Sequence, residues 1–140
     1  MAEEGLLYDP ATTNDDRPYF AAVSGRPMLV LPYAFDTNDA HFWGGQSGPG
    51  YTGATNSFGY LKDPFDVLYR ESDESATMMS VGLHARIVRP GRVASIIRFL
   101  EYVRTKDGVW IAKRNDIAAH FAREFAPANT WNLDAIASLS

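Results

Sequence analysis

The chain has 140 residues, enough for one ordinary domain, and 46% of them are hydrophobic and 13% aromatic, which is typical of a globular protein. Its apolar runs are too short to cross a membrane, and a net charge of −4 provides no broad basic face for nucleic acid. The absence of cysteine excludes disulfides and thiolate metal sites, and the start MAEEGLLYDP lacks the features of a secretory signal. We therefore expect a cytoplasmic protein that binds neither nucleic acid nor membrane.

Apolar runs and turn residues predict the first elements. Leu6–Tyr8 is predicted to be a short strand, and the polar stretch Ala11–Arg17 a loop. Met28–Tyr33, with the sequence MLVLPY, predicts a strand buried on both faces that ends near Pro32. The next stretch, Asp36–Thr55, holds five glycines and three aromatic residues, so we expect a long loop that acts as a lid.

In the second half of the chain, segments whose apolar residues have the spacing of a helix alternate with segments that have the spacing of a strand. Apolar residues recur every three or four positions after Asn56, after the RPGR sequence and after Asn115-Asp116, which predicts three helices. Their apolar residues are Phe58, Leu61, Phe65 and Leu68, then Ile96, Ile97, Leu100 and Val103, then Ile117, Phe121 and Phe125. Strands are predicted over Thr77–Leu83 and Val109–Ala112. This alternation predicts parallel strands with right-handed helical crossovers.

A histidine and three arginines follow the strand predicted over Thr77–Leu83. His84 falls where this strand ends, which is where parallel α/β folds place their chemistry. An imidazole exchanges protons near neutral pH, and the guanidinium groups of Arg86 and Arg89 can hold a developing anion. The alternative is a hydrogen-bonded histidine with a structural role, beside arginines that pair with nearby acids or with solvent.

Seven segments, in order, resemble one known family. LLYD, NDDRPY, LVLPYAFDTND, YLKDPFDVLY, MMSVGLHARIVRPGR, RFLEYV and VWIAKRNDIAAHF span Leu6 to about Arg123. Together they resemble the C-terminal part of the NodB-like polysaccharide deacetylase superfamily, in its allantoinase and cyclic-imide-hydrolase branch. The resemblance implies an α/β fold in which residues 1–126 form the C-terminal half of a (β/α) barrel. The unpaired edges of so short a parallel sheet predict that a partner chain completes it, and the mix of Pro, Asn and Ser with apolar residues over 127–140 predicts an arm or tail.

The resemblance also bears on cofactors and on specificity. The superfamily's usual metal site uses an early Asp and a His-x-x-x-His pair, which this chain lacks, while the allantoinase branch is described as working without a metal. We therefore expect no cofactor from this chain, and zinc only where a partner supplies the ligands. The sequence departs from the family where Val88 runs directly into Arg89 in place of GRPGR, and where YDPATTNDDRPYF replaces YDSDAYNDDLPYW.

Candidate site residues follow from position and resemblance together. His84 is predicted to be catalytic, as the proton donor to a leaving nitrogen. The candidate substrate-binding residues are Arg86, Asn14, Asp15, Asp16, Asp36, Asn38 and Asp39. The Asn14–Asp16 stretch could equally hold His84 in its working tautomer or form an ordinary turn. His41, Phe42 and Trp43 could close over a ligand or anchor the loop, whereas His120 is expected to be structural.

These inferences leave three functions open. The leading hypothesis is a subunit or fragment of an amidohydrolase that cleaves a non-peptide C–N bond in a small amide, imide or ureide. The expected partners are this substrate and a protein chain that supplies the N-terminal half of the barrel, unless the chain self-associates. The alternatives are a non-catalytic assembly or ligand-binding subunit that kept the fold, and a carbohydrate N-deacetylase.

Overall fold

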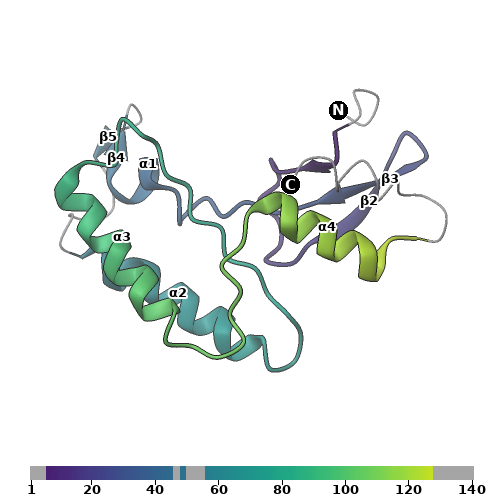
Figure 1. Cartoon of the computed structure of the whole chain (residues 1–140). Helices are drawn as coiled ribbons and strands as arrows, with labels where there is room; N and C mark the ends of the chain where they lie inside the picture. Colours follow the sequence, from purple (N-terminus) through teal and green to yellow (C-terminus); the bar gives the residue numbers. More distant parts are fainter. Residues whose placement is uncertain (1–5, 46–47, 50–55, 128–140) are drawn as a thin grey trace. The chain divides into compact units, whose positions relative to one another are not determined.

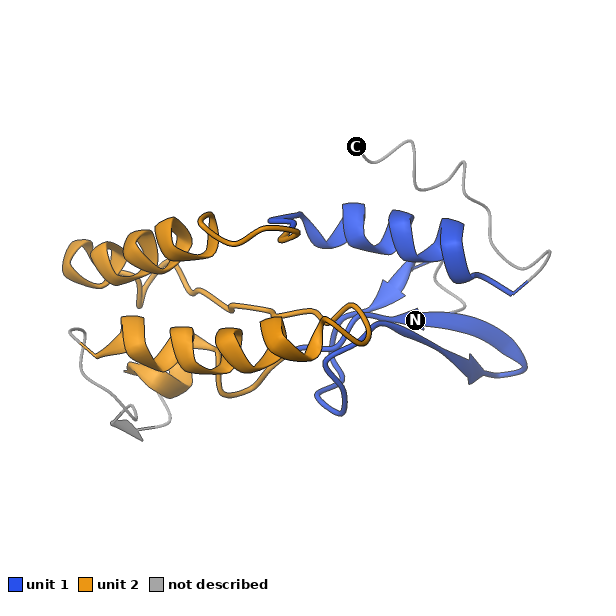
Figure 2. Ribbon diagram, turned by 90° about the horizontal axis from the view of Figure 1, so that it is seen from below, with its two compact units in different colours: residues 1–33, 110–140 blue, residues 34–109 orange. Residues whose placement is uncertain are grey.

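The computed structural model describes residues 6–45, 48–49 and 56–127 (Figure 1). In chain order its elements are β1 (Tyr8–Asp9), β2 (Tyr19–Val23), β3 (Arg26–Val30), α1 (Asp39–Phe42), β4 (Gly44–Gly45), β5 (Gly48–Pro49), α2 (Ser57–Glu71), α3 (Pro90–Val103) and α4 (Arg114–Phe125). The chain divides into two compact units, coloured blue and orange in Figure 2. Unit 1 comprises residues 1–33 and 110–140, and unit 2 comprises residues 34–109. Unit 2 is thus inserted into the sequence of unit 1.

Unit 1 contains a mixed three-stranded sheet with the order β1-β3-β2. β1 pairs with β3 in parallel, and β2 pairs with β3 in antiparallel fashion. β2 and β3 form a hairpin whose two connecting residues, Ser24 and Gly25, both have positive φ angles, of 51° and 75°. This geometry matches a type I′ turn, whose twist suits a two-residue hairpin.

Helix α4 packs on this sheet. Phe121 lies against Phe20 of β2, with ring centroids 5.8 Å apart, and Ala118 and Ala122 are buried. The Tyr8 hydroxyl donates to Oδ1 of Asn115 at 3.1 Å, and the Arg114 guanidinium donates to the carbonyl oxygens that follow β3. Apolar contact and polar bonds at its N-terminus together fix the helix on the sheet.

Unit 2 is built on the packing of α2 against α3. Its buried apolar core consists of Phe42, Trp43, Leu61, Phe65, Ile87, Ile96, Phe99 and Val103. Aromatic side chains dominate the contact, and the ring of Phe65 meets that of Phe99 edge to face with centroids 5.9 Å apart. The helical spacing read from the sequence therefore predicted both helices correctly, and Pro64 lies inside α2 without ending it.

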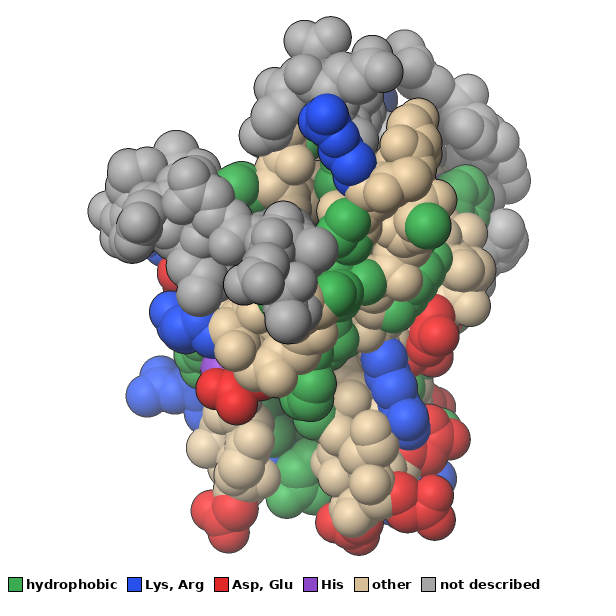
Figure 3. Space-filling model, turned by 90° about the vertical axis from the view of Figure 1, so that its right-hand side faces the viewer, with side chains coloured by type: hydrophobic (Ala, Val, Ile, Leu, Met, Phe, Trp, Pro, Cys, Tyr) green, Lys and Arg blue, Asp and Glu red, His purple; other side chains and the backbone are tan. Residues whose placement is uncertain are grey.

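Large apolar side chains also remain at the surface. On α3, Ile97 is 49% exposed and Leu100 is 40% exposed, although Ile96 and Phe99 of the same helix are buried. In unit 1, Trp110 and Phe125 are exposed as well. Hydrophobic side chains are visible between charged ones on the face shown in Figure 3. No helix of the described part is long and apolar enough to cross a bilayer.

The α/β class is as predicted, but the regular alternation of parallel strands and helices is wrong for the described residues. No strand was predicted over Tyr19–Val23, where β2 forms the antiparallel arm of a hairpin. The signal was present in Ser24-Gly25, a short turn between two apolar runs. β1 overlaps the strand predicted over Leu6–Tyr8 only at Tyr8, and β3 overlaps the strand predicted over Met28–Tyr33 at residues 28–30 and ends before Pro32.

Two predicted strands are not regular strands. Residues 77–83 have no regular secondary structure apart from an isolated parallel bridge between Gly82 and Asn38. Residues 109–112 have no regular structure. The alternation over 77–83 does reflect burial, because Met79 and Val81 contact the core of unit 2 while Leu83 is exposed. A regular strand also needs hydrogen bonds to a neighbouring backbone along its whole length. In the described part of unit 2, only Thr37–Asp39 forms such bonds with residues 77–83.

Three further expectations concern loops and caps. The stretch Asp36–Thr55 is not a plain loop, because α1, β4 and β5 lie within it. Residues 46–47 and 50–55, including much of the proposed lid, and residues 128–140 of the predicted arm fall outside the described residues. α3 begins within the RPGR sequence and not after it, since Arg89 is the N-cap residue and Pro90 and Gly91 lie in the first turn of the helix. α4 likewise begins at Arg114, so Asn115 and Asp116 lie in its first turn.

Candidate active site

The candidate site lies in unit 2, where two segments distant in sequence are joined through their backbones. The Gly82 N–H donates to the Thr37 carbonyl at 3.2 Å, and the Asp39 N–H donates to the Gly82 carbonyl at 2.9 Å. The buried Thr37 hydroxyl adds a bond of 2.5 Å to the Ser80 carbonyl. Asp39 is thereby placed opposite the residues that follow Gly82.

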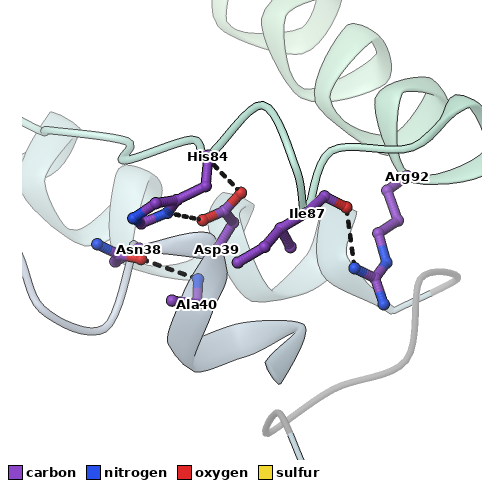
Figure 4. Close-up of polar contacts among 6 residues, drawn as sticks. All are labelled: Asn38, Asp39, Ala40, His84, Ile87 and Arg92. Carbon is purple, nitrogen blue, oxygen red and sulfur yellow. Dashed lines mark hydrogen bonds and ion pairs between the residues drawn. The ribbon is translucent and has the colours of Figure 1, made fainter. Parts of the chain in front are cut away.

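Helix α1 orients Asp39 within this arrangement. Asn38 caps the helix, because its Oδ1 accepts a hydrogen bond of 2.8 Å from the Ala40 N–H (Figure 4). Asp39 is the first residue of the helix, and its side chain points toward His84 (Figure 4).

The carboxylate of Asp39 binds His84 through both oxygens. Oδ2 accepts a hydrogen bond of 2.7 Å from the His84 backbone N–H, and Oδ1 lies 2.6 Å from Nδ1 of the imidazole. The Asp39 side chain is 0% exposed, whereas that of His84 is 42% exposed. A buried carboxylate beside Nδ1 favours the tautomer with a proton on Nδ1, which leaves Nε2 for chemistry at the surface.

The turn after His84 is anchored in the core. The N–H groups of Ile87 and Val88 both donate to the His84 carbonyl, at 2.8 and 3.0 Å, and Ile87 is buried. Arg92 donates to the Ile87 carbonyl at 2.9 Å (Figure 4), and its guanidinium lies 5.4 Å from the centre of the Trp43 ring. The backbone around His84 is thus held on both sides, which preorganises the imidazole.

The other predicted residues of unit 2 differ in environment. Asp36 is exposed, and its Oδ1 accepts a hydrogen bond of 3.0 Å from the Thr37 N–H. Asn38 is buried and serves as the α1 cap. Arg86 is exposed, in the turn that begins at His84. Their predicted contact with substrate stays a prediction.

Asn14, Asp15 and Asp16 belong to unit 1. Oδ1 of Asn14 accepts a hydrogen bond of 3.0 Å from the Tyr19 hydroxyl. Oδ1 of Asp15 accepts bonds from the N–H groups of Asp16 and Arg17, an arrangement typical of a polar turn. The role of holding the His84 ring, considered for these residues, is filled by Asp39. Their substrate-binding role stays a prediction.

Two features of the site were not found from the sequence. Asp39 was predicted to bind substrate, but the structure shows it buried against His84. Thr37, which joins the two segments, was not singled out at all. A local signal did exist, since Thr37-Asn38-Asp39 has the pattern of a helix cap after a strand. Among the described residues, no group of three or more His, Asp or Glu side chains could hold a metal ion.

The chain resembles known proteins in both sequence and fold. No family model matches the sequence. A curated protein of Schizosaccharomyces pombe, named "putative polysaccharide deacetylase", is 36% identical over 122 residues, which cover 79% of this chain and 37% of that protein. The crystal structure of a "probable polysaccharide deacetylase" from Pseudomonas aeruginosa PAO1 shares 43% identity at a TM-score of 0.77, over 94% of this chain and 43% of the other.

The chain is therefore similar in sequence and in fold to polysaccharide deacetylases, as the sequence resemblance predicted. An allantoinase is among the similar structures. PuuE allantoinase is 42% identical with a TM-score of 0.78, and the match covers 94% of this chain and 42% of PuuE allantoinase. The chain thus spans less than half the length of these relatives, which is consistent with the predicted likeness to their C-terminal part.

Proposed function

We propose that the chain forms part of a hydrolase that cleaves a non-peptide C–N bond in an amide, imide or ureide. The observation that carries this proposal is the His84–Asp39 pair, in which a half-exposed imidazole is held by a fully buried carboxylate. The chain's likeness to polysaccharide deacetylases and to an allantoinase supports this reaction class.

His84 acts in this proposal as the proton donor to the leaving nitrogen. When a C–N bond breaks, the departing nitrogen must gain a proton, and an imidazole near neutral pH can give it. Asp39 is a positioning residue, because the contact of its Oδ1 with Nδ1 fixes the direction of Nε2. Asn14, Asp15, Asp16, Asp36, Asn38 and Arg86 are proposed to orient the substrate, and the glycine-rich loop of residues 44–53 to exclude water.

The rest of the site is proposed to come from outside this chain. The chain matches less than half of its relatives, and α3 leaves apolar side chains exposed. We propose that another polypeptide, or a second copy of this chain, completes the barrel. The described residues do not form a metal site, so no step proposed for this chain passes through a metal. Zinc would belong to the complex only where the partner supplies the ligands.

The test uses the full chain, alone and mixed with the complement, defined as the part of PuuE allantoinase that this chain does not match. Hydrolysis of allantoin, succinimide and N-acetylglucosamine oligomers is measured for the wild type, His84→Ala and His120→Ala. His120 is the control, since it lies against Trp110 in unit 1. We expect His84→Ala to lower kcat by about 10²- to 10⁴-fold and His120→Ala to leave it nearly unchanged.

Each result decides between the functions. Turnover that His84→Ala does not reduce would remove His84 from the mechanism. Turnover only of N-acetylated sugars would identify a carbohydrate N-deacetylase. A folded complex without turnover of any of these compounds would favour the non-catalytic role.

A further inference from the structure

The segment that carries His84 is basic in an acidic protein. The whole chain has a net charge of −4, yet residues 77–100 contain four arginines and no aspartate or glutamate. These arginines are Arg86, Arg89, Arg92 and Arg98. Such a concentration of positive charge in the segment that carries the imidazole favours the binding of negatively charged groups to this segment.

The four arginines differ in their contacts. Arg92 binds the Ile87 carbonyl and lies over Trp43, and Arg98 donates to the Ser95 hydroxyl at 3.1 Å. Arg86 and Arg89 are exposed, and within the described part of the chain neither guanidinium has a hydrogen bond or an ion pair. The nearby carboxylate of Asp39 is not free to pair with them, because it is buried and both of its oxygens contact His84.

Arg86 is the arginine held in the same turn as the imidazole. The hydrogen bonds from the Ile87 and Val88 N–H groups to the His84 carbonyl close the turn around Arg86. Buried Ile87 anchors this turn in the core of unit 2. Arg89 lies beyond the turn, as the N-cap residue of α3. Arg86 is therefore the exposed arginine that the backbone holds within the same turn as His84.

We propose that Arg86 determines specificity by binding a carboxylate of the substrate, so that the preferred substrates are amides or ureides that carry a carboxylate near the scissile C–N bond. This inference rests on the proposed hydrolase function. A guanidinium forms paired, charge-assisted hydrogen bonds with a carboxylate, and these are stronger than bonds to neutral groups. A neutral sugar has no such group, which makes carbohydrate N-deacetylation the less suitable reaction.

The test compares two ureides that differ only in charge: N-carbamoylglycine, which carries a carboxylate, and its carboxamide, N-carbamoylglycinamide. Their binding to the full chain, with the complement present, is measured by calorimetric titration of the wild type, Arg86→Ala, Arg86→Lys and Arg89→Ala. We expect the wild type to bind the carboxylate about tenfold more tightly than the carboxamide. Arg86→Ala should lose this preference, Arg86→Lys should keep part of it, and Arg89→Ala should keep most of it.

The Arg89→Ala variant distinguishes a specific contact between Arg86 and the carboxylate from general electrostatic attraction by the basic segment. An equal loss of preference in Arg86→Ala and Arg89→Ala, or no preference in the wild type, would overturn the proposal. Circular dichroism checks that each variant is folded, which we expect because both side chains are exposed. Binding is measured apart from turnover, so a failure of the hydrolase proposal appears as absent hydrolysis by the wild type, and a failure of the Arg86 proposal as an absent binding preference.

Discussion

The carboxylate of Asp39 is closed off from solvent, and both of its oxygens contact the same residue, His84. An ionised carboxylate is costly to bury unless hydrogen bonds compensate for its lost hydration. Here the backbone N–H and the imidazole of His84 provide those bonds. The position of Asp39 and the orientation of His84 therefore depend on each other.

Replacing Asp39 by Asn tests this dependence. Asn has one acceptor oxygen, so its NH₂ group must face either the His84 N–H or the ring, and the tautomer that presents Nε2 for proton transfer is no longer enforced. We expect kcat to fall by about 10²-fold or more while KM changes little, and the pH–rate profile to change shape. Asp63→Asn is the control, because Asp63 is exposed on α2. A loss of activity that matches only the loss of folded protein would contradict a positioning role.

α2 and α3 are joined by polar contacts as well as by the aromatic core. Lys62 and Asp66 form an ion pair along α2, and the Tyr102 hydroxyl of α3 donates to the other Asp66 oxygen at 2.6 Å. The Lys62 ammonium, and then the Tyr102 hydroxyl, hold the pKa of Asp66 below its usual 3.8. The hydrogen bond to Asp66 likewise raises the pKa of Lys62 above 10.5.

These pKa directions predict a pH dependence of stability. Because the pKa of Asp66 is lowered by folding, its contribution to stability is present above pH 3.8 and is lost as the pH falls through the lowered folded value. Asp66→Asn should therefore reduce the free energy of unfolding near pH 6 by about 1 kcal/mol or less, since the pair is partly exposed, and the difference should shrink below pH 3.8. Urea unfolding at both pH values measures this, with Asp63→Asn as the control. A difference that persists unchanged in acid would show that the ion pair does not cause it.

The β2–β3 hairpin depends on backbone conformation at its turn. Gly25 has φ of +75°, and a Cβ there would meet no atom within 4 Å, so only the backbone conformation opposes a side chain. Gly59, inside α2, has the same open surroundings but lies in a regular helix. Gly25 and Gly59 therefore have the same free space for a side chain but differ in backbone conformation.

Alanine at these two positions should have opposite effects. Gly25→Ala is expected to destabilise the protein by about 1 kcal/mol, because an L residue is unfavourable at positive φ. Gly59→Ala is expected to stabilise it by about 0.5–1 kcal/mol, since alanine has the higher helix propensity. Thermal unfolding of both variants measures the effects. Equal shifts of the same sign would contradict the type I′ assignment.

The elements that the sequence predicted well are those that local spacing determines. α2 and α3 bury residues three and four positions apart, and this periodicity is visible without knowledge of any partner. Residues 77–83 have the alternation of a strand, but whether they join a ladder depends on which backbone lies beside them. His84 was singled out as a candidate from its place at the end of this segment. The part played by Asp39 depends on the contact between residues 37–39 and 80–84, which no local pattern encodes.

At the level of the whole molecule, the candidate residues are divided between the two units, and the chain matches only part of each relative. Unit 2 holds the His84–Asp39 pair, and unit 1 holds Asn14, Asp15 and Asp16. The relatives are more than twice as long as the part that this chain matches. α3 is apolar on the face that packs in the core and also at Ile97 and Leu100, which the described residues leave exposed. An exposed apolar face on a helix whose other side is already packed is typical of a contact surface.

We therefore expect the exposed face of α3 to contact the polypeptide that completes the fold. Sedimentation velocity of the chain, alone and mixed with the complement, should show a species heavier than the monomer. Replacing Ile97 and Leu100 together by Glu should abolish that species, because two charges would have to be desolvated at the contact. Both positions are exposed, so unit 2 should stay folded, and Val23→Glu, an exposed change in unit 1, is the control. A chain that remains a stable monomer and does not bind the complement would show that it needs no partner.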